Sequence, residues 1–392
     1  MRRNHVIYGD VREKLAELPA DSVHCCVTSP PYWGLRDYHG HADQIGSEPT
    51  YQEFVTTMVD VFREVRRVLR DDGTLWLNLG DSYTSGGRTT FRSGASRNKG
   101  HDVQNGQRRP GQPSDLKPKD LVGIPWRVAI ALQADGWWLR ADIIWAKPSP
   151  MPGSQRDRPT TAHEYIFLLT KSARYWYDCE AIKTESNRGG ERAWYAGGSG
   201  SRANAMGREP SGNERPESRS EVGHRANKRS VWTVASQGYS GAHFACYPPK
   251  LIEPCILAGC PEQCCPACGR GYVPTVESER VPTRPGTDTK IPSNWATGSG
   301  SHGNQLNDRN KAALVGNRDP QRHVTTTRVT GYAPGCECEP VEPVRGIVLD
   351  PFMGSGTTAQ VAQNNGRDWI GIELNRENAE LIANRTQQKN LF

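Results

Sequence analysis

The stretch IVLDPFMGSGTT, residues Ile347–Thr358, decides the fold. Its apolar, β-branched start predicts a buried strand that ends at Asp350, and the Gly354-Ser355-Gly356 turn then opens a helix through to about Gln363. Glycines at such a turn let the backbone approach a ligand closely, and the helix N-terminus presents amide groups to it. The pattern therefore predicts an α/β domain that binds a cofactor at this turn.

A second strand, Trp369–Ile372, follows and ends at Glu373. A carboxylate at the tip of this strand suits the two ribose hydroxyls of a nucleoside cofactor. Dinucleotide binding is the competing interpretation of the glycine turn. It is disfavoured because the third glycine of the dinucleotide pattern is absent, and because Thr357 and Thr358 stand where pyrophosphate packing requires small residues.

A second motif, Thr28-Ser29-Pro30-Pro31-Tyr32-Trp33, follows the apolar run Val23–Val27, which predicts another buried parallel strand. The two prolines end the strand and stiffen the turn. The Ser29 hydroxyl and the Pro30 carbonyl can accept hydrogen bonds from an exocyclic amine, and the Tyr32 ring can stack on a base. Taken alone, such a turn is more often a strand-to-loop corner with a buried tyrosine, but the glycine turn in the same chain favours ligand binding.

Together the two motifs resemble those of the amino-methylating DNA methyltransferases. Val27–Tyr32 is similar to the catalytic motif of the N4-cytosine group, and Asp350–Thr358 is similar to the cofactor loop. The catalytic motif comes first, which is the order of the permuted β class. The resemblance implies a Rossmann-like α/β fold, S-adenosylmethionine as cofactor, double-stranded DNA as partner and methyl transfer to cytosine N4. Adenine N6 is the alternative, since both bases present the same NH2 edge.

The resemblance assigns catalysis to the turn formed by Ser29, Pro30, Pro31 and Tyr32. It also implies cofactor contacts from the glycine turn, from two strand tips and from a segment that precedes the cofactor strand. These residues are Asp350, Phe352, Gly354, Ser355, Gly356, Thr357, Thr358, Glu373, Asp10, His243 and Phe244.

Two aspartates follow other predicted strands. Asp10 comes after the strand His5–Tyr8, which in the permuted order lies beside the Glu373 strand, so its carboxylate is expected near the cofactor adenine. A surface-turn aspartate is the equal alternative. Asp81 follows the strand Gly73–Gly80 and is a further candidate, because open α/β sheets bind ligands at such strand ends.

Four of the 11 cysteines have the spacing of metal ligands. Cys265 and Cys268 form a knuckle, and Cys336 and Cys338 supply a second close pair about 70 residues later. Two such pairs can surround one zinc ion tetrahedrally, and four thiolates leave no open position, so the zinc would be structural. The alternative ligands are Cys260 and Cys264.

The composition indicates a core diluted by polar insertions: the hydrophobic content is 35%, with 40 glycines and 28 prolines in 392 residues. The net charge of +6 permits nucleic-acid binding without establishing it. No apolar run approaches ~20 residues and the N-terminus lacks the apolar region of a signal peptide. We therefore expect a cytoplasmic protein without a membrane span.

These patterns predict a divided methyltransferase domain. The expected parts are a catalytic half at 1–177 with a flexible basic loop at 84–118, a target-recognition region at 178–230, a return to the core at 231–259, a cysteine-rich insertion at 260–340 and a cofactor half at 341–392. A disordered linker is the alternative for 178–230. Within these parts we expect helices at 51–69 and 119–134, a sheet closed by Arg174–Tyr177 and a flexible excursion at 275–328.

Two other function classes deserve comparison. A nicotinamide-dependent oxidoreductase would use the glycine turn, but it leaves the Ser-Pro-Pro-Tyr turn without a role. A non-catalytic nucleic-acid module would rest on the cysteine knuckle and the basic loops. The chain carries no nuclease motif, so a restriction endonuclease partner would be a separate protein.

Overall fold

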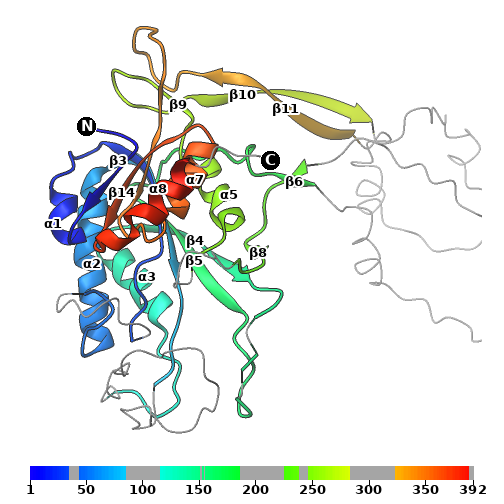
Figure 1. Ribbon diagram of the computed structural model, residues 1–392. Coiled ribbons are helices and arrows are strands. Elements are labelled where there is room, and N and C mark those ends of the chain that lie inside the picture. The colour runs from blue at the N-terminus through cyan, green and yellow to red at the C-terminus, as the bar shows by residue number, and fades with distance from the viewer. Residues whose placement is uncertain are drawn as a thin grey trace, which may run out of the picture. The chain divides into compact units, whose positions relative to one another are not determined.

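The computed structural model describes residues 1–34, 44–84, 115–150, 152–153, 155–185, 225–237, 246–282 and 323–387. The chain divides into two compact units. Unit 1 comprises Met1–Ile182, Asn227–Val273 and Tyr332–Phe392, and unit 2 comprises Lys183–Ala226 and Pro274–Gly331. Both sequence motifs lie in unit 1, and Figure 1 labels several of its helices and strands. Among the described helices, none has the length and apolar character needed to cross a membrane.

An eight-stranded sheet forms the centre of unit 1, in the order β1-β14-β13-β2-β3-β5-β4-β8. Its strands are β1 (His5–Tyr8), β14 (Asp368–Glu373), β13 (Ile347–Asp350), β2 (Val23–Thr28), β3 (Leu69–Leu79), β5 (His163–Thr170), β4 (Trp138–Ala146) and β8 (Val231–Thr233). The run from β1 to β3 is parallel, and β5 is antiparallel to both of its neighbours. β1 lies beside β14, as the permuted order predicts, and β2 lies beside β13, so the strands that precede the two sequence motifs are neighbours.

Helices cover both faces of this sheet (Figure 1). One face packs on α1 (Val11–Ala16), α2 (Tyr51–Val68) and α3 (Ile124–Ala134), and the other on α5 (Pro249–Gly259), α7 (Thr357–Asn364) and α8 (Ala379–Gln387). Cys25 and Cys26 of β2 belong to opposite clusters, because successive side chains of a strand alternate between faces. This double cover explains why β2 is buried along its whole length.

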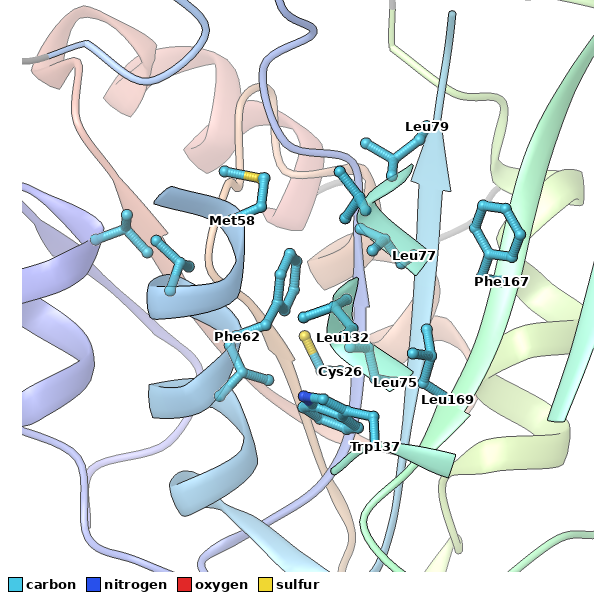
Figure 2. Close-up of a cluster of buried hydrophobic side chains, with 14 of the residues drawn as sticks. Cys26, Met58, Phe62, Leu75, Leu77, Leu79, Leu132, Trp137, Phe167 and Leu169 are labelled. Atoms are coloured by element: carbon cyan, nitrogen blue, oxygen red, sulfur yellow. The ribbon is translucent and has the colours of Figure 1, made fainter. Parts of the chain in front are cut away.

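The amphipathic helix predicted at 51–69 is confirmed by α2, which ends one residue earlier. Thr50 caps its start and forms a capping box with Glu53. The apolar stripe is buried, and Figure 2 shows Met58 and Phe62 packed among side chains of the sheet such as Leu75 and Leu77. β3 begins directly after the helix, at Leu69, and is therefore longer than the predicted strand.

Three predictions about elements were wrong. The helix expected from residue 119 begins at Ile124, because Gly123 has left-handed backbone and Pro125 occupies the first turn. Arg174–Tyr177 is not a strand of the sheet, although the Trp176 amide donates to the Asp72 carbonyl of β3 at 2.9 Å; the edge strand beside β4 is β8. The excursion at 275–328 is not wholly irregular, since β10 (Val273–Pro282) and β11 (His323–Ala333) pair in a two-stranded sheet.

Short elements complete the described chain. They are β6 (Thr184–Glu185), β7 (Arg225–Ala226), β9 (Gln263–Cys264), β12 (Val344–Arg345) and the 3-10 helix η2 (Arg376–Asn378). The antiparallel pair of β9 and β12 joins the cysteine-rich segment to the chain that enters β13.

Gly259, the last residue of α5, allows that helix to touch the sheet. Its carbonyl accepts a hydrogen bond from Thr74 Oγ1 at 3.1 Å, and an added Cβ would overlap Trp76 Nε1 and Thr74 Oγ1. We expect Gly259→Ala to lower the free energy of unfolding by about 1–3 kcal/mol, the usual cost of overpacking, measured by urea denaturation. Gly331→Ala is the control, since its Cβ would meet only Thr275 Oγ1 at 3.5 Å. Equal midpoints for both variants would contradict this close packing.

Candidate active site

The two motifs meet where β2 and β13 end. Thr28, the last residue of β2, donates from Oγ1 to Asp350 Oδ1 at 2.7 Å, and Asp350 is the last residue of β13. The Ser29–Tyr32 turn and the glycine turn therefore start from one point at the carboxyl edge of the sheet. Ligands bind at this edge in open α/β sheets.

Asp350 connects several parts of this edge. It is only 2% exposed, and both carboxylate oxygens are occupied. Besides Thr28, its donors are Thr358 Oγ1 at 2.5 Å, the Phe352 amide at 3.1 Å and the Tyr247 hydroxyl at 3.2 Å. Burial raises the pKa of Asp350, and the hydroxyl donors offset part of that rise. The carboxylate thus holds the glycine turn, α7 and the catalytic strand together.

The glycine turn has the backbone that its sequence predicts. Gly354 and Gly356 have φ of +53° and +83°, a region where side chains are strained. Among the described residues, no atom lies within 4 Å of a Cβ added at Gly354. Gly356 is the N-cap of α7, whose first amides face the same region. The turn thus combines left-handed glycines with the N-terminus of a helix.

Glu373 lies at the tip of β14 and is 9% exposed. Its Oε2 accepts from the Gly354 amide at 2.7 Å, and its Oε1 accepts from the Asn375 amide at 2.9 Å and Asn378 Nδ2 at 3.1 Å. Burial raises the pKa of this carboxyl. The structure thus places the Glu373 carboxylate beside the glycine turn.

Asp10 lies just beyond β1, which pairs with β14 as predicted. Its carboxylate caps α1, accepting from the Arg12 amide at 2.8 Å, and it pairs with the Arg12 guanidinium at 2.6 Å. The hydrogen bond from Arg12 lowers the pKa of Asp10. The contact of Asp10 with a cofactor stays a prediction.

Asp81 binds the backbone at the start of α3, and its contact with a ligand stays a prediction. Its Oδ1 accepts from the amides of Ser82 at 2.8 Å, Gly123 at 2.9 Å and Ile124 at 3.0 Å. Asp81 thereby accepts from backbone amides at the start of α3. The N-cap residue, Gly123, has no side chain that could accept from them.

Arg385 of α8 holds the hydroxyls of the glycine turn. Its Nη1 donates to Ser355 Oγ at 2.9 Å and to Thr357 Oγ1, and the residue is 5% exposed. Cys246 Sγ lies 2.9 Å from Ser355 Oγ. Sequence reasoning missed Arg385, although it lies three residues after the buried Ile382. A charged residue on the buried face of a helix was the available signal.

The catalytic turn packs closely against β3. An added Cβ at Gly80 would overlap the Tyr32 ring, so the ring lies directly over this glycine. The Tyr32 hydroxyl donates to Glu164 Oε2 at 2.8 Å and lies 3.2 Å from Asn78 Oδ1. Ser29 Oγ lies 3.4 Å from that hydroxyl. The turn is held in one orientation by strands β3 and β5.

Some predicted contacts lie outside the described residues. These are His243 and Phe244, the basic loop apart from its ends, and most of the expected target-recognition region at 186–224.

A family model described as DNA methylase, of the N6 and N4 methyltransferase type, matches residues 23–264 and 339–384. The chain belongs to this family. Type II methyltransferase M.SmaI of Serratia marcescens is 38% identical over 98% of this chain and 91% of its own length. M.Cfr9I of Citrobacter freundii is 37% identical over 97% of this chain and 86% of its own.

The solved structure titled PvuII DNA methyltransferase (cytosine-N4-specific) matches with a TM-score of 0.50 at 15% identity, covering 100% of this chain and 89% of that one. The predicted methyltransferase fold is therefore confirmed. Family membership also decides against the oxidoreductase and the non-catalytic module. This chain is an amino-methylating DNA methyltransferase.

The methyltransferase also has four cysteine thiols close enough together to bind one metal ion. The Sγ atoms of Cys265, Cys268, Cys336 and Cys338 all lie within 4.8 Å of one another. Amides of Cys268 and Ala267 lower the pKa of Cys265 to about 7, whereas contacts with the other thiols raise the pKa of Cys338 to about 12. Four thiolates this close repel one another, so full ionisation requires a cation among them. The donor set suits zinc.

His24 of β2 joins this cluster to the sheet. Its Nδ1 accepts from the Ile347 amide at 3.0 Å, so Nε2 carries the proton and donates to the Gly269 carbonyl at 3.0 Å. Burial lowers the pKa of His24 to about 4, which keeps the ring neutral. The knuckle is thereby tied to the starts of both functional strands, and all four cysteines belong to unit 1.

Proposed function

We propose that this methyltransferase transfers the methyl group of S-adenosylmethionine to N4 of cytosine in double-stranded DNA. The supporting observation is the junction of the two turns, joined by the 2.7 Å hydrogen bond between Thr28 and Asp350. A base bound at the Ser29–Tyr32 turn and a cofactor bound at the glycine turn would meet there.

S-adenosylmethionine supplies an electrophilic methyl group carried on a sulfonium. The left-handed backbone at Gly354, where no described atom lies within 4 Å of an added Cβ, favours close approach of such a ligand. We assign the ribose hydroxyls to Glu373 and the polar end of the cofactor to the amides at the start of α7. Asp350 and Thr358, whose polar atoms are used within the protein, would act by holding the turn. The other predicted contacts, among them Phe352 and Asp10, stay predictions.

The target amine is a poor nucleophile because its lone pair is delocalised into the ring. Acceptors at Ser29 Oγ and the Pro30 carbonyl would hold its two protons and favour a pyramidal nitrogen, whose lone pair can then attack in line. The base must leave the duplex to reach this turn, and Tyr32 offers a ring on which it can stack. No cysteine nucleophile is needed.

The choice of cytosine over adenine rests on Ser29. In the family resemblance, serine at the first motif position points to cytosine N4, and Asp or Asn would point to adenine N6. The solved structure that shares the fold carries a cytosine-N4-specific title. Adenine N6 remains the second candidate, because the chemistry of the turn suits both amines.

The test is expression in a host without DNA methylation, followed by mass spectrometry of the digested nucleosides. We expect N4-methylcytosine from the wild type, and about 10²–10³-fold less from Ser29→Ala, the range for loss of one preorganised hydrogen-bond partner. Tyr32→Ala should also lose the product. Asp135→Asn is the control, since it breaks only an ion pair with Arg63. N6-methyladenine would overturn the assignment of the base, and no methylated base would overturn the proposal.

We also propose that the four cysteines bind one structural zinc ion. The basic loop at 84–118 and the region at 178–230 are proposed DNA contacts, supported by their charge and composition. The names of the relatives favour a role in a restriction-modification system beside a separate endonuclease.

A further inference from the structure

A chain of polar side chains connects the catalytic turn to the interior of the sheet. Ser29 Oγ lies 3.4 Å from the Tyr32 hydroxyl, which donates to Glu164 Oε2 on β5 at 2.8 Å. On its other side, Glu164 Oε1 accepts from Lys147, the residue that follows β4. The proposed amine acceptor is thus linked through one tyrosine to an ion pair.

The ion pair is held in place by its surroundings. The side chains of Lys147 and Glu164 are 22% and 18% exposed. Lys147 Nζ lies 4.4 Å from the centroid of the Trp145 ring, and its backbone amide donates to the Ala162 carbonyl at 2.8 Å. These contacts of Lys147 hold the Glu164 carboxylate in place beside the Tyr32 hydroxyl.

The amide of Asn78 adds a second constraint on the tyrosine. Its Nδ2 donates to the Tyr165 carbonyl at 3.0 Å, which leaves its Oδ1 as the atom that faces the Tyr32 hydroxyl. Asn78 Oδ1 and Glu164 Oε2 are both acceptors, so the hydroxyl proton of Tyr32 is directed into the sheet and away from Ser29.

These contacts set the direction of the hydrogen bond between Ser29 and Tyr32. A phenol has one proton, and here Glu164, the stronger acceptor, takes it. The Tyr32 oxygen can then only accept from Ser29, so the Ser29 proton points to Tyr32. The Ser29 oxygen then keeps both of its lone pairs for a donor on the substrate side. A serine without this arrangement can rotate and present its proton to the target amine, which opposes binding.

We propose that Glu164 is a positioning residue that makes Ser29 a hydrogen-bond acceptor toward the target base. The inference rests on the proposed function and deepens it. Glu164 does not touch the base and acts through the Tyr32 hydroxyl. The same arrangement selects an NH2 edge, since a carbonyl such as that of thymine would face the lone pairs of Ser29.

The test is a double-mutant cycle with the full-length protein, duplex DNA and radiolabelled S-adenosylmethionine. We expect Glu164→Gln and Tyr32→Phe each to lower kcat by about 10²-fold, with KM for DNA and cofactor little changed. Because Glu164 acts through the hydroxyl, the double variant should be no more than about 2-fold worse than Tyr32→Phe alone. Asp135→Asn is again the control for loss of an ion pair.

The possible results test the proposed function and the role of Glu164 separately. Wild-type protein that transfers no methyl group overturns the proposed function. If the wild type is active, two results would overturn only the role of Glu164. One is an unchanged kcat in Glu164→Gln, and the other is a double variant in which the two losses of kcat multiply. Glu164→Gln leaves the Lys147 charge without this carboxylate, so melting temperatures are compared. If that variant does not fold, Glu164→Gln with Lys147→Met removes both charges, and the same loss of kcat is expected.

Discussion

Cys265→Ser is expected to remove bound zinc and to unfold much of unit 1. The purified wild type should carry one zinc ion per chain and the variant almost none, measured by elemental analysis of the metal. Structural zinc in zinc-finger peptides contributes an apparent ~10–16 kcal/mol at neutral pH, more than the stability of most domains. Because His24 joins Gly269 of the knuckle to Ile347 of β13, the loss should extend into the central sheet and lower its melting temperature.

The control for this prediction is Cys179→Ser, which replaces an exposed thiol outside the cluster and should keep both zinc and stability. Zinc binding should also weaken as pH falls. The thiols must lose protons to bind the metal, and the pKa of Cys338 stands at about 12 in the protein alone, so protons compete with zinc. Competition with a chelator at pH 6 and pH 8 measures this. Equal, near-zero metal in wild type and Cys265→Ser would reject the zinc site.

The central sheet could be predicted from sequence because its functional strands end in short, distinctive motifs. β2, β13 and β14 each combine an apolar run with a tip that carries polar or glycine residues, and such patterns are local. Their polar partners could not be predicted. Tyr247 meets Asp350 across 103 residues and Tyr32 meets Glu164 across 132. These pairings depend on strand register and helix position, which no local pattern specifies.

The two aspartates at other strand ends show a second limit. Asp10 and Asp81 were candidates because carboxylates at such positions often bind ligands. In the structure Asp10 caps α1 and Asp81 caps α3. Backbone amides at the start of the next helix make the same demand on a carboxylate as a ligand donor does. Position at a strand tip therefore cannot distinguish a cap from a binding group.

Asp350→Ala is expected to abolish methyl transfer and to destabilise the domain. The substitution would leave the Thr28, Thr358 and Tyr247 hydroxyls and the Phe352 amide without their buried acceptor. Each unsatisfied group costs about 1–3 kcal/mol, although some can find new partners, so we expect a loss of about 3–5 kcal/mol in the free energy of unfolding. Urea denaturation measures this loss in the free energy of unfolding.

The effect of Asp350→Ala on activity should exceed its effect on folding, because Asp350 sets the spacing between the two turns. A displacement of about 1 Å between reacting groups can lower the rate by ~10²-fold. Asp350→Ala removes the hydrogen bonds to both Thr28 and Thr358, so we expect methyl transfer to fall by more than ~10³-fold at a temperature where the variant is folded. Asp350→Asn is the matched variant. It keeps the shape and an acceptor oxygen for Thr28 and the Phe352 amide, and the hydroxyls of Thr358 and Tyr247 can rotate to accept from its NH2, so partial activity should return. A folded Asp350→Ala protein with wild-type activity would show that the junction does not position the reacting groups.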